Sequence, residues 1–254
     1  MSHSDNLLQQ NHNPPMEQAH RLADYIENNG LKPFPLPHEF FYASLPLCVI
    51  DAVFSIGVTY TSTVNTVIRF CEQQDWTRFL EPDAPQAKGE HTITEFLTLF
   101  DGLTPDQIAN NLFGNRQRTS TRSGILKAEA VQRFAGALKE SGIDGFDDLT
   151  EARLSAAETL VRGIPGQRSG ISSDYFRMLS GDDNVIKPDR MVQRYIARAL
   201  GEAPQNISPA RARNLLQRAT LLLVKRGQDW SPRRLDHSIW KIESSKMQEL
   251  RRVC

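Results

Sequence analysis

The residues at 160–172, Leu-Val-Arg-Gly-Ile-Pro-Gly-Gln-Arg-Ser-Gly-Ile-Ser, combine a helix end, a tight turn and a second helix start. This order predicts a helix-hairpin-helix. Glycines let a backbone approach an anion closely, and free amides at a helix N-terminus point at it. We therefore expect the stretch to bind DNA phosphates, a contact that fixes register without reading bases, through Pro165, Gly166, Arg168, Ser169, Gly170 and Ser172.

An aspartate, Asp189, follows Gly170 by nineteen residues and opens an amphipathic helix after Pro188. The positive helix end, together with Lys187 and Arg190, should favour its anionic form. A fixed carboxylate can stabilise a cationic centre and orient an attacking water. The alternative is a simple helix cap, a common use of aspartate. We also expect Lys187 and Arg190 to contact phosphates.

A second carboxylate, Asp51, lies inside an almost wholly apolar helical stretch, where an ionised group is costly unless it is paired. Two interpretations stay open for it. Asp51 either forms a salt bridge with a core arginine or serves as the acid of a base pocket that also contains Ser55, Tyr60 and Tyr42. Aromatic residues such as Tyr42, Tyr60 and Trp240 are also ordinary components of a core.

Basic residues are unevenly distributed. Residues 1–111 carry 5 lysines and arginines against 14 acidic residues, whereas residues 112–254 carry 25 against 16. A basic half suggests a surface that meets polyanions, and solvated helix faces are the alternative. Arg116, Arg118 and Lys127 are interleaved with hydroxyl residues, which favours phosphate contacts for them.

Helix signals dominate and strand signals are nearly absent, so the sequence predicts an all-α fold. Apolar side chains recur at helical spacing in 125–138, 154–161, 191–199 and 215–224, and a glycine follows each run. Two capping boxes, Thr92 to Glu95 and Thr104 to Gln107, mark further helix starts. The acidic residues 75–91 are interpreted as a surface connection.

Several classes of protein are excluded by composition. The chain of 254 residues is 39% hydrophobic and 24% charged, as expected for a globular protein with a core. It has no apolar run long enough for a membrane helix and no signal peptide. The three cysteines form neither a disulfide framework nor a four-cysteine cluster, which favours the cytoplasm, and His237 stands without metal-ligand spacing.

The hairpin, the spacing to Asp189 and the Lys127-Ala128 helix one element upstream together resemble the helix-hairpin-helix–GPD superfamily of DNA glycosylases, of the endonuclease III and adenine-mismatch type. The residues from Ile50 to Asn65 resemble the early helix and turn whose tip enters the duplex in that family. The resemblance covers about residues 40–200.

Departures from the family pattern are specific. Gly170 stands where bifunctional members carry a lysine nucleophile, so no amine is present for a Schiff base. Arg168 replaces the second hairpin glycine, which would alter the monovalent cation site that the family has at the hairpin. Gly57 stands where many relatives have a glutamine that fills the vacated base position, and Tyr60 is a candidate substitute.

The resemblance implies two helical subdomains with the active-site cleft between them. It predicts a flexible N-terminus (1–15), a domain (16–254) with its hairpin core at about 92–200, and a second subdomain formed by about 16–75 and 208–254. The implied protein is a monomeric, monofunctional glycosylase of double-stranded DNA that needs no cofactor and leaves an abasic site. Damaged, mismatched and hypermodified bases all fit, in repair or in defence against phages with modified DNA.

Two other functions remain open. One is a helix-hairpin-helix DNA-binding protein without chemistry, in which Asp189 is only a cap. The other is a helical protein–protein scaffold, whose binding would lack the steep salt dependence of phosphate contacts.

Overall fold

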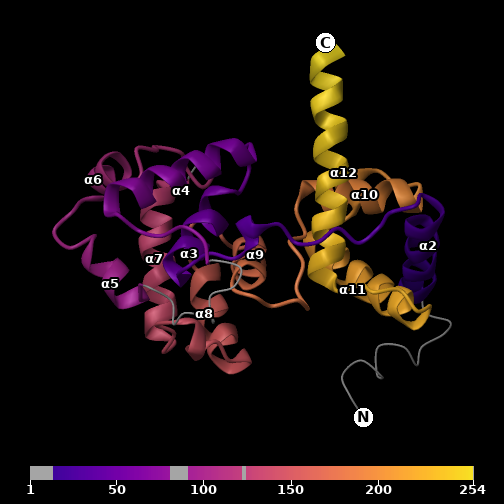
Figure 1. Cartoon of the computed structure of the whole chain (residues 1–254), viewed down its shortest axis with the longest axis horizontal. Helices are drawn as coiled ribbons and strands as arrows, with labels where there is room; N and C mark the ends of the chain where they lie inside the picture. The colour runs from indigo at the N-terminus through magenta and orange to yellow at the C-terminus, as the bar shows by residue number, and fades with distance from the viewer. Residues whose placement is uncertain (1–13, 81–90, 122–123, 254) are drawn as a thin grey trace. The chain divides into compact units, whose positions relative to one another are not determined.

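The computed structural model of the protein describes residues 14–80, 91–121 and 124–253, and these residues are mostly helical (Figure 1). Apart from two isolated bridge pairs, Tyr42 with Phe79 and Arg118 with Leu126, they contain no strand pairing. The all-α prediction is confirmed. Of the predicted N-terminal tail, residues 1–13 lie outside the described residues. No helix among those described is both long and apolar enough to cross a membrane.

The chain folds as two compact units. Unit 1 comprises residues 1–37 and 182–254, and unit 2 comprises residues 38–181. These boundaries differ from the predicted ones, in which 38–75 belongs with the C-terminal helices and 182–200 with the hairpin. The reason for the difference is packing. The helix at 45–54 is buried on all sides within unit 2, and the helix that follows Asp189 packs on the N- and C-terminal helices.

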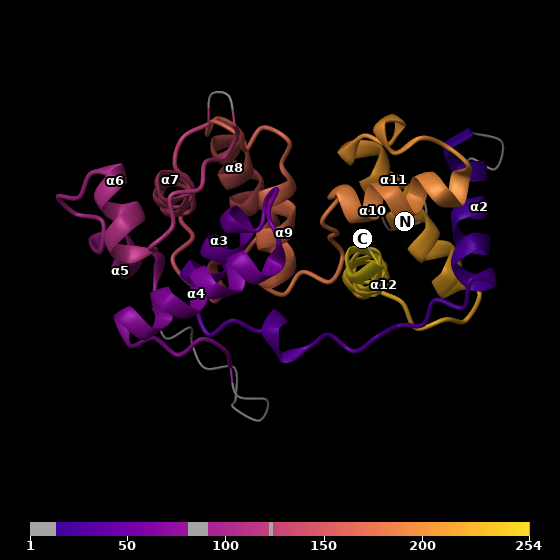
Figure 2. The ribbon, with the colours of Figure 1, turned by 90° about the horizontal axis from the view of Figure 1, so that it is seen from above.

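Unit 2 is built around helix α3, whose residues are all buried. Figures 1 and 2 show α3 among α4, α7 and α9, which are its neighbours in the packing. The elements of the unit are η1 (His38–Phe40), α3 (Leu45–Phe54), α4 (Tyr60–Gln74), α5 (Ile93–Thr98), α6 (Pro105–Gln107), the π-helical turn η2 (Ile108–Leu112), α7 (Lys127–Glu140), η3 (Phe146–Asp148), α8 (Glu151–Arg162) and α9 (Ile171–Leu179).

Unit 1 packs α2 against α11, side by side in both views, and α10 against α12 (Figures 1 and 2). Its elements are α2 (Pro14–Asn28), α10 (Arg190–Leu200), η4 (Pro204–Asn206), α11 (Pro209–Lys225) and α12 (Pro232–Val253). The stripe Val192, Ile196 and Leu200 buries one face of α10 in this core. Each such side chain contributes about 1.5–3 kcal/mol on burial, which holds the start of α10 in a fixed place.

Local capping signals are realised as predicted. The Thr92 hydroxyl accepts from the Glu95 amide at 3.1 Å, and the Glu95 carboxylate accepts from the Thr92 amide at 3.0 Å. The second capping box, from Thr104 to Gln107, also forms both of its bonds. These bonds satisfy amides that a helix start leaves free.

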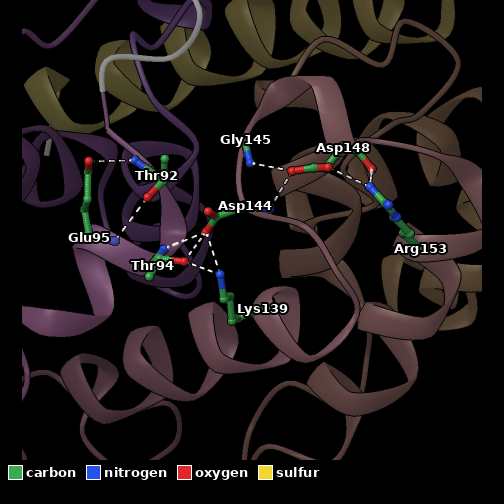
Figure 3. A network of polar contacts seen from close by, with 8 residues as sticks. All are labelled: Thr92, Thr94, Glu95, Lys139, Asp144, Gly145, Asp148 and Arg153. Carbon is green, nitrogen blue, oxygen red and sulfur yellow. Dashed lines mark hydrogen bonds and ion pairs between the residues drawn. The ribbon is translucent and has the colours of Figure 1, made fainter.

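A polar network joins α5, α7 and α8 in unit 2 (Figure 3). Asp144 Oδ1 accepts from the amide and the hydroxyl of Thr94 at 2.8 and 2.6 Å. Asp148 Oδ2 accepts from the amides of Asp144 and Gly145 at 3.0 Å each. Burial raises the pKa of Asp144, but the bonds from Thr94 and the nearby Lys139 outweigh it, and the net shift is downward. The two amides and Arg153 lower the pKa of Asp148.

This network predicts an acid-sensitive contribution to stability. A carboxyl whose pKa is lowered by folding stabilises the fold above its unfolded value, near 3.8, and loses that contribution as the pH falls through the folded value. Asp148→Ala should lower the free energy of unfolding by about 1 kcal/mol at pH 7, the scale of a lost cap. The loss should shrink below pH 3.8, where the wild-type carboxyl also becomes protonated.

Urea unfolding followed by circular dichroism at several pH values measures both effects. Asp147→Ala is the matched control, because Asp147 is the exposed neighbour in the same turn. A pH-independent loss for Asp148→Ala, or an equal loss for both variants, would contradict the role given to the Asp148 carboxylate.

Candidate nucleic-acid interface and base pocket

The residues predicted to form the hairpin lie in α8, in the turn 163–170 and in α9, and this segment keeps the name hairpin below. The Gln167 amide donates to Ile164 O at 2.9 Å and the Gly170 amide to Gln167 O at 3.0 Å. Gly166 and Gly170 have φ values of +87° and +75°, which favour glycine. Because Gly170 is the N-cap of α9, the helix starts without a side-chain cap. The Ile171 amide donates to Ser169 Oγ at 3.5 Å, and the N-cap glycine offers no side-chain acceptor to the amides that follow, as an anion site requires.

The side chains of the turn divide into two groups. Pro165, Arg168 and Ser169 are exposed, as contacts with DNA would require. Ser172 is only 1% exposed, and its hydroxyl donates to the buried Gln167 Oε1 at 2.5 Å. That hydroxyl braces the turn from inside, so the phosphate contact predicted for Ser172 would have to use its backbone amide.

Arg162 occupies the space above Gly170. Its Nη1 donates to Arg168 O at 2.8 Å, and its Nε and Nη2 bind Glu158. A Cβ atom built on Gly170 would lie 2.4 Å from Arg162 Nη2. Position 170 is thus closed to any side chain unless Arg162 moves.

The loop before α7 contains the basic residues predicted to bind phosphate. Arg116 is exposed but paired with Asp106 and Asn110, and the exposed Arg118 donates to Gly124 O at 2.9 Å. Lys127 is 2% exposed, and its ammonium binds the carbonyls of Phe54 and Ile56. The prediction that Lys127 contacts phosphate is wrong, because its ammonium is buried and already hydrogen-bonded to carbonyls of the protein.

The predicted base-pocket residues come together around the end of α3. The Tyr42 hydroxyl donates to Asp51 Oδ2 at 2.9 Å, and both residues are buried, at 3% and 0% exposure. Burial, then the charge of Asp51 and the nearby Tyr60, raises the pKa of Tyr42 well above its usual value. Ser55 caps the C-terminus of α3, with its amide on Asp51 O at 2.9 Å. A base reaches Asp51 only if the surrounding side chains move.

One aromatic neighbour of this group was not predicted. The centroids of the Phe79 and Tyr42 rings lie 5.1 Å apart. The Arg78 guanidinium lies over the Phe79 ring, 4.1 Å from its centroid. Backbone bonds from Ala43 N to Arg78 O and from Leu80 N to Phe41 O hold the two segments together. The acidic composition of 75–91 indicated only a surface connection, and no sequence signal marked Phe79.

Asp189 lies in unit 1 and is the N-cap of α10. Its Oδ1 accepts from the amides of Met191 and Val192 at 2.7 and 3.3 Å. Both cap bonds use the same oxygen, so Oδ2 lies outside the cap. Asp189 and Lys187 are half-buried and Arg190 is exposed.

The segment that leads to Asp189 is anchored by the first turns of α12. The Lys187 amide donates to Asp236 Oδ1 at 3.1 Å, and the Arg233 amide donates to Asp183 O at 3.1 Å. His237, next to Asp236, is buried and stacks on Trp240 with ring centroids 6.2 Å apart. Trp240 thus belongs to unit 1, apart from the Tyr42 group of unit 2. No cluster of three potential metal ligands occurs among the residues described.

Comparison with known proteins gives a family but no activity. A family model described as a domain of unknown function (DUF8548) matches residues 20–244, so the chain belongs to that family. No curated protein and no solved structure matches the chain.

The contact between Arg162 and Gly170 yields a stability prediction. Gly170→Ala should lower the free energy of unfolding by more than the about 1–2 kcal/mol that a left-handed alanine costs, because the added methyl also displaces Arg162. Gly142→Ala is the matched control, with the same φ of +75° but its nearest contact, Arg153, at 3.5 Å. Chemical denaturation gives both values.

The pair can be tested further with a double-mutant cycle. Arg162→Ala should relieve part of the excess loss in the Gly170→Ala background. Equal losses for Gly170→Ala and Gly142→Ala would show that the guanidinium does not restrict position 170.

Proposed function

We propose that the protein is a monofunctional DNA glycosylase that removes a base from double-stranded DNA and leaves an abasic site. The observation that carries this proposal is the carboxylate of Asp189 at the start of α10, held through Oδ1 alone at the expected sequence distance from a glycine-rich hairpin. The cap bonds fix the Asp189 carboxylate in place. Its second oxygen, Oδ2, lies outside the cap and is the atom proposed to act in the reaction.

In this proposal the hairpin of unit 2 binds the DNA backbone. The start of α9, whose N-cap glycine offers no side-chain acceptor, and the exposed Arg168 support phosphate contact there. The target nucleotide leaves the base stack, since an enzyme cannot reach its glycosidic bond within the duplex. The Tyr42–Asp51 pair is the proposed contact for the extruded base, because a buried carboxyl can hydrogen-bond or protonate a ring atom.

Asp189 is the proposed catalytic residue of unit 1. As the bond between the base and C1′ breaks, the electron pair leaves with the base and the sugar gains positive charge. A fixed carboxylate stabilises that charge and orients the water whose oxygen bonds to C1′. The water proton that is released returns to the departing base through solvent or a pocket acid.

The absence of lyase activity is part of the proposal. A lysine at position 170 would supply the amine for a covalent imine with the sugar, and glycine cannot. The close approach of Arg162 to Gly170 supports this assignment. The proposed substrates are damaged, mismatched or hypermodified bases such as glucosylated cytosine, in base excision repair or phage defence, and the proposed enzyme is a cytoplasmic monomer without a cofactor.

A second candidate is a DNA-binding protein without chemistry. It is favoured by the two bonds through which Asp189 caps α10, since a cap alone explains an aspartate at this position. The two candidates differ in what Asp189 does once DNA is bound.

Asp189→Asn separates them. Asparagine caps about as well as aspartate, so the variant should fold normally and bind DNA at least as tightly as the wild type. Base release should fall by roughly two to four orders of magnitude, because the cationic transition state loses its counter-charge. Single-turnover release at saturating protein, on the duplex that the wild type acts on, is the measurement.

Asp229→Asn is the charge-matched control, since Asp229 is an exposed residue of unit 1 whose partner is Arg234. It should release base at the wild-type rate. Undiminished release by Asp189→Asn would refute the proposed mechanism.

A further inference from the structure

Lys127 is a buried cation at the junction of three segments of unit 2. Its ammonium donates to Phe54 O at 2.8 Å, to Ile56 O at 2.8 Å and to Gln117 Oε1 at 3.3 Å. Burying an ammonium is costly, and three acceptors match its three donors. Phe54 is the last residue of α3 and Ile56 lies in the turn that follows, so the charge binds the carbonyl end of a helix.

Gln117 extends this contact to the other side of the turn. Its Nε2 donates to Ser62 Oγ in the first turn of α4 at 2.9 Å, and its carbonyl accepts from the Lys127 amide at 2.8 Å. The turn between α3 and α4 is therefore held at both ends by one pair of side chains. Its tip stays at the surface, where Gly57 and Thr59 are exposed.

The same loop reaches the hairpin. A Cβ atom on Gly166 would lie 2.5 Å from the Cβ of Thr119, so Thr119 packs directly on the glycine of the hairpin turn. Thr119 is paired with the start of α7 through its amide, which donates to Ile125 O at 2.9 Å. Gln117, Thr119 and Lys127, from the described residues 117–121 and 124–127, thus connect the α3–α4 turn with the hairpin.

We propose that Lys127, through Gln117, is a positioning residue that holds the α3–α4 turn in register with the hairpin, so that the turn can occupy the space of the extruded base. This inference rests on the proposed function. A purely structural lysine would stabilise the fold without affecting how the turn meets DNA. In the positioning role, by contrast, loss of the Lys127 charge weakens binding to a duplex that lacks a base.

The test compares two affinities of the full chain. Fluorescence anisotropy measures Kd for an intact duplex and for the same duplex with a single tetrahydrofuran abasic analogue. The wild type should prefer the analogue. Lys127→Met should keep its affinity for the intact duplex but lose at least about tenfold in preference, the scale of one charge-assisted hydrogen bond.

Lys225→Met is the control, because Lys225 is an exposed lysine of unit 1 at the end of α11, and it should keep the preference. If Lys127→Met fails to fold by circular dichroism, Gln117→Ala decides, since it removes the link to Ser62 and keeps the charge. A smaller loss of preference in that variant supports the proposal.

The outcomes separate the two proposals. A wild-type protein that binds both duplexes equally would count against the proposed function itself. A wild-type preference that survives unchanged in a folded Lys127→Met, or in Gln117→Ala where the first does not fold, would overturn the positioning role alone.

Discussion

The burial of α3 is the constraint on which unit 2 depends. Every residue of this helix is buried, so its polar groups must find partners inside the protein. Tyr42 binds the Asp51 carboxylate, and Lys127 binds the carbonyls at the helix end. Both partners come from outside the helix. Tyr42 and Lys127 are therefore fixed relative to α3, and with them the aromatic group around Tyr42 and the Gln117 side chain bound to Lys127.

In unit 1 the start of α10 places a similar constraint on one carboxylate, that of Asp189. The amides at the start of α10 need acceptors, and Asp189 supplies one oxygen to two of them. The apolar face of α10 and the contacts of α12 with residues 183–187 keep this helix start in place. A catalytic carboxylate needs such a fixed position, because stabilisation of a transition state is effective only where the charge is already oriented. The cap and the proposed chemistry are therefore compatible uses of one side chain.

The parts of the fold that could be predicted from the sequence are those set by local signals. Thr92 and Thr104 mark helix starts because the cap forms within three residues, and Gly166 and Gly170 mark the turn between α8 and α9 because their backbone needs positive φ. Asp189 at a helix start was also accessible, since it follows from its place after Pro188. A charge in an apolar stretch indicated that Asp51 needs a partner, but the hydrogen bond from Tyr42 was not predicted.

The rest depends on partners far apart in the chain. Lysine is usually a surface residue, but the acceptor of the Lys127 ammonium, Phe54 O, lies 73 residues away and is known only once the helices have packed. Phe79 follows an acidic stretch that gave no hint of its contact with Tyr42. The predicted division into units differs from the observed one for the same reason. The neighbours of α3 and of α10 are set by packing between segments that are distant in the sequence.

The central claim is that the protein breaks a glycosidic bond in DNA. Mass spectrometry of free bases released from duplexes with damaged, mismatched and phage-type modified bases tests it most directly. A glycosylase should release at least one kind of base, with strands that stay intact until hot alkali cleaves the abasic site. Salt-sensitive binding to the same duplexes without release of any base would contradict it and would favour a binding protein without chemistry.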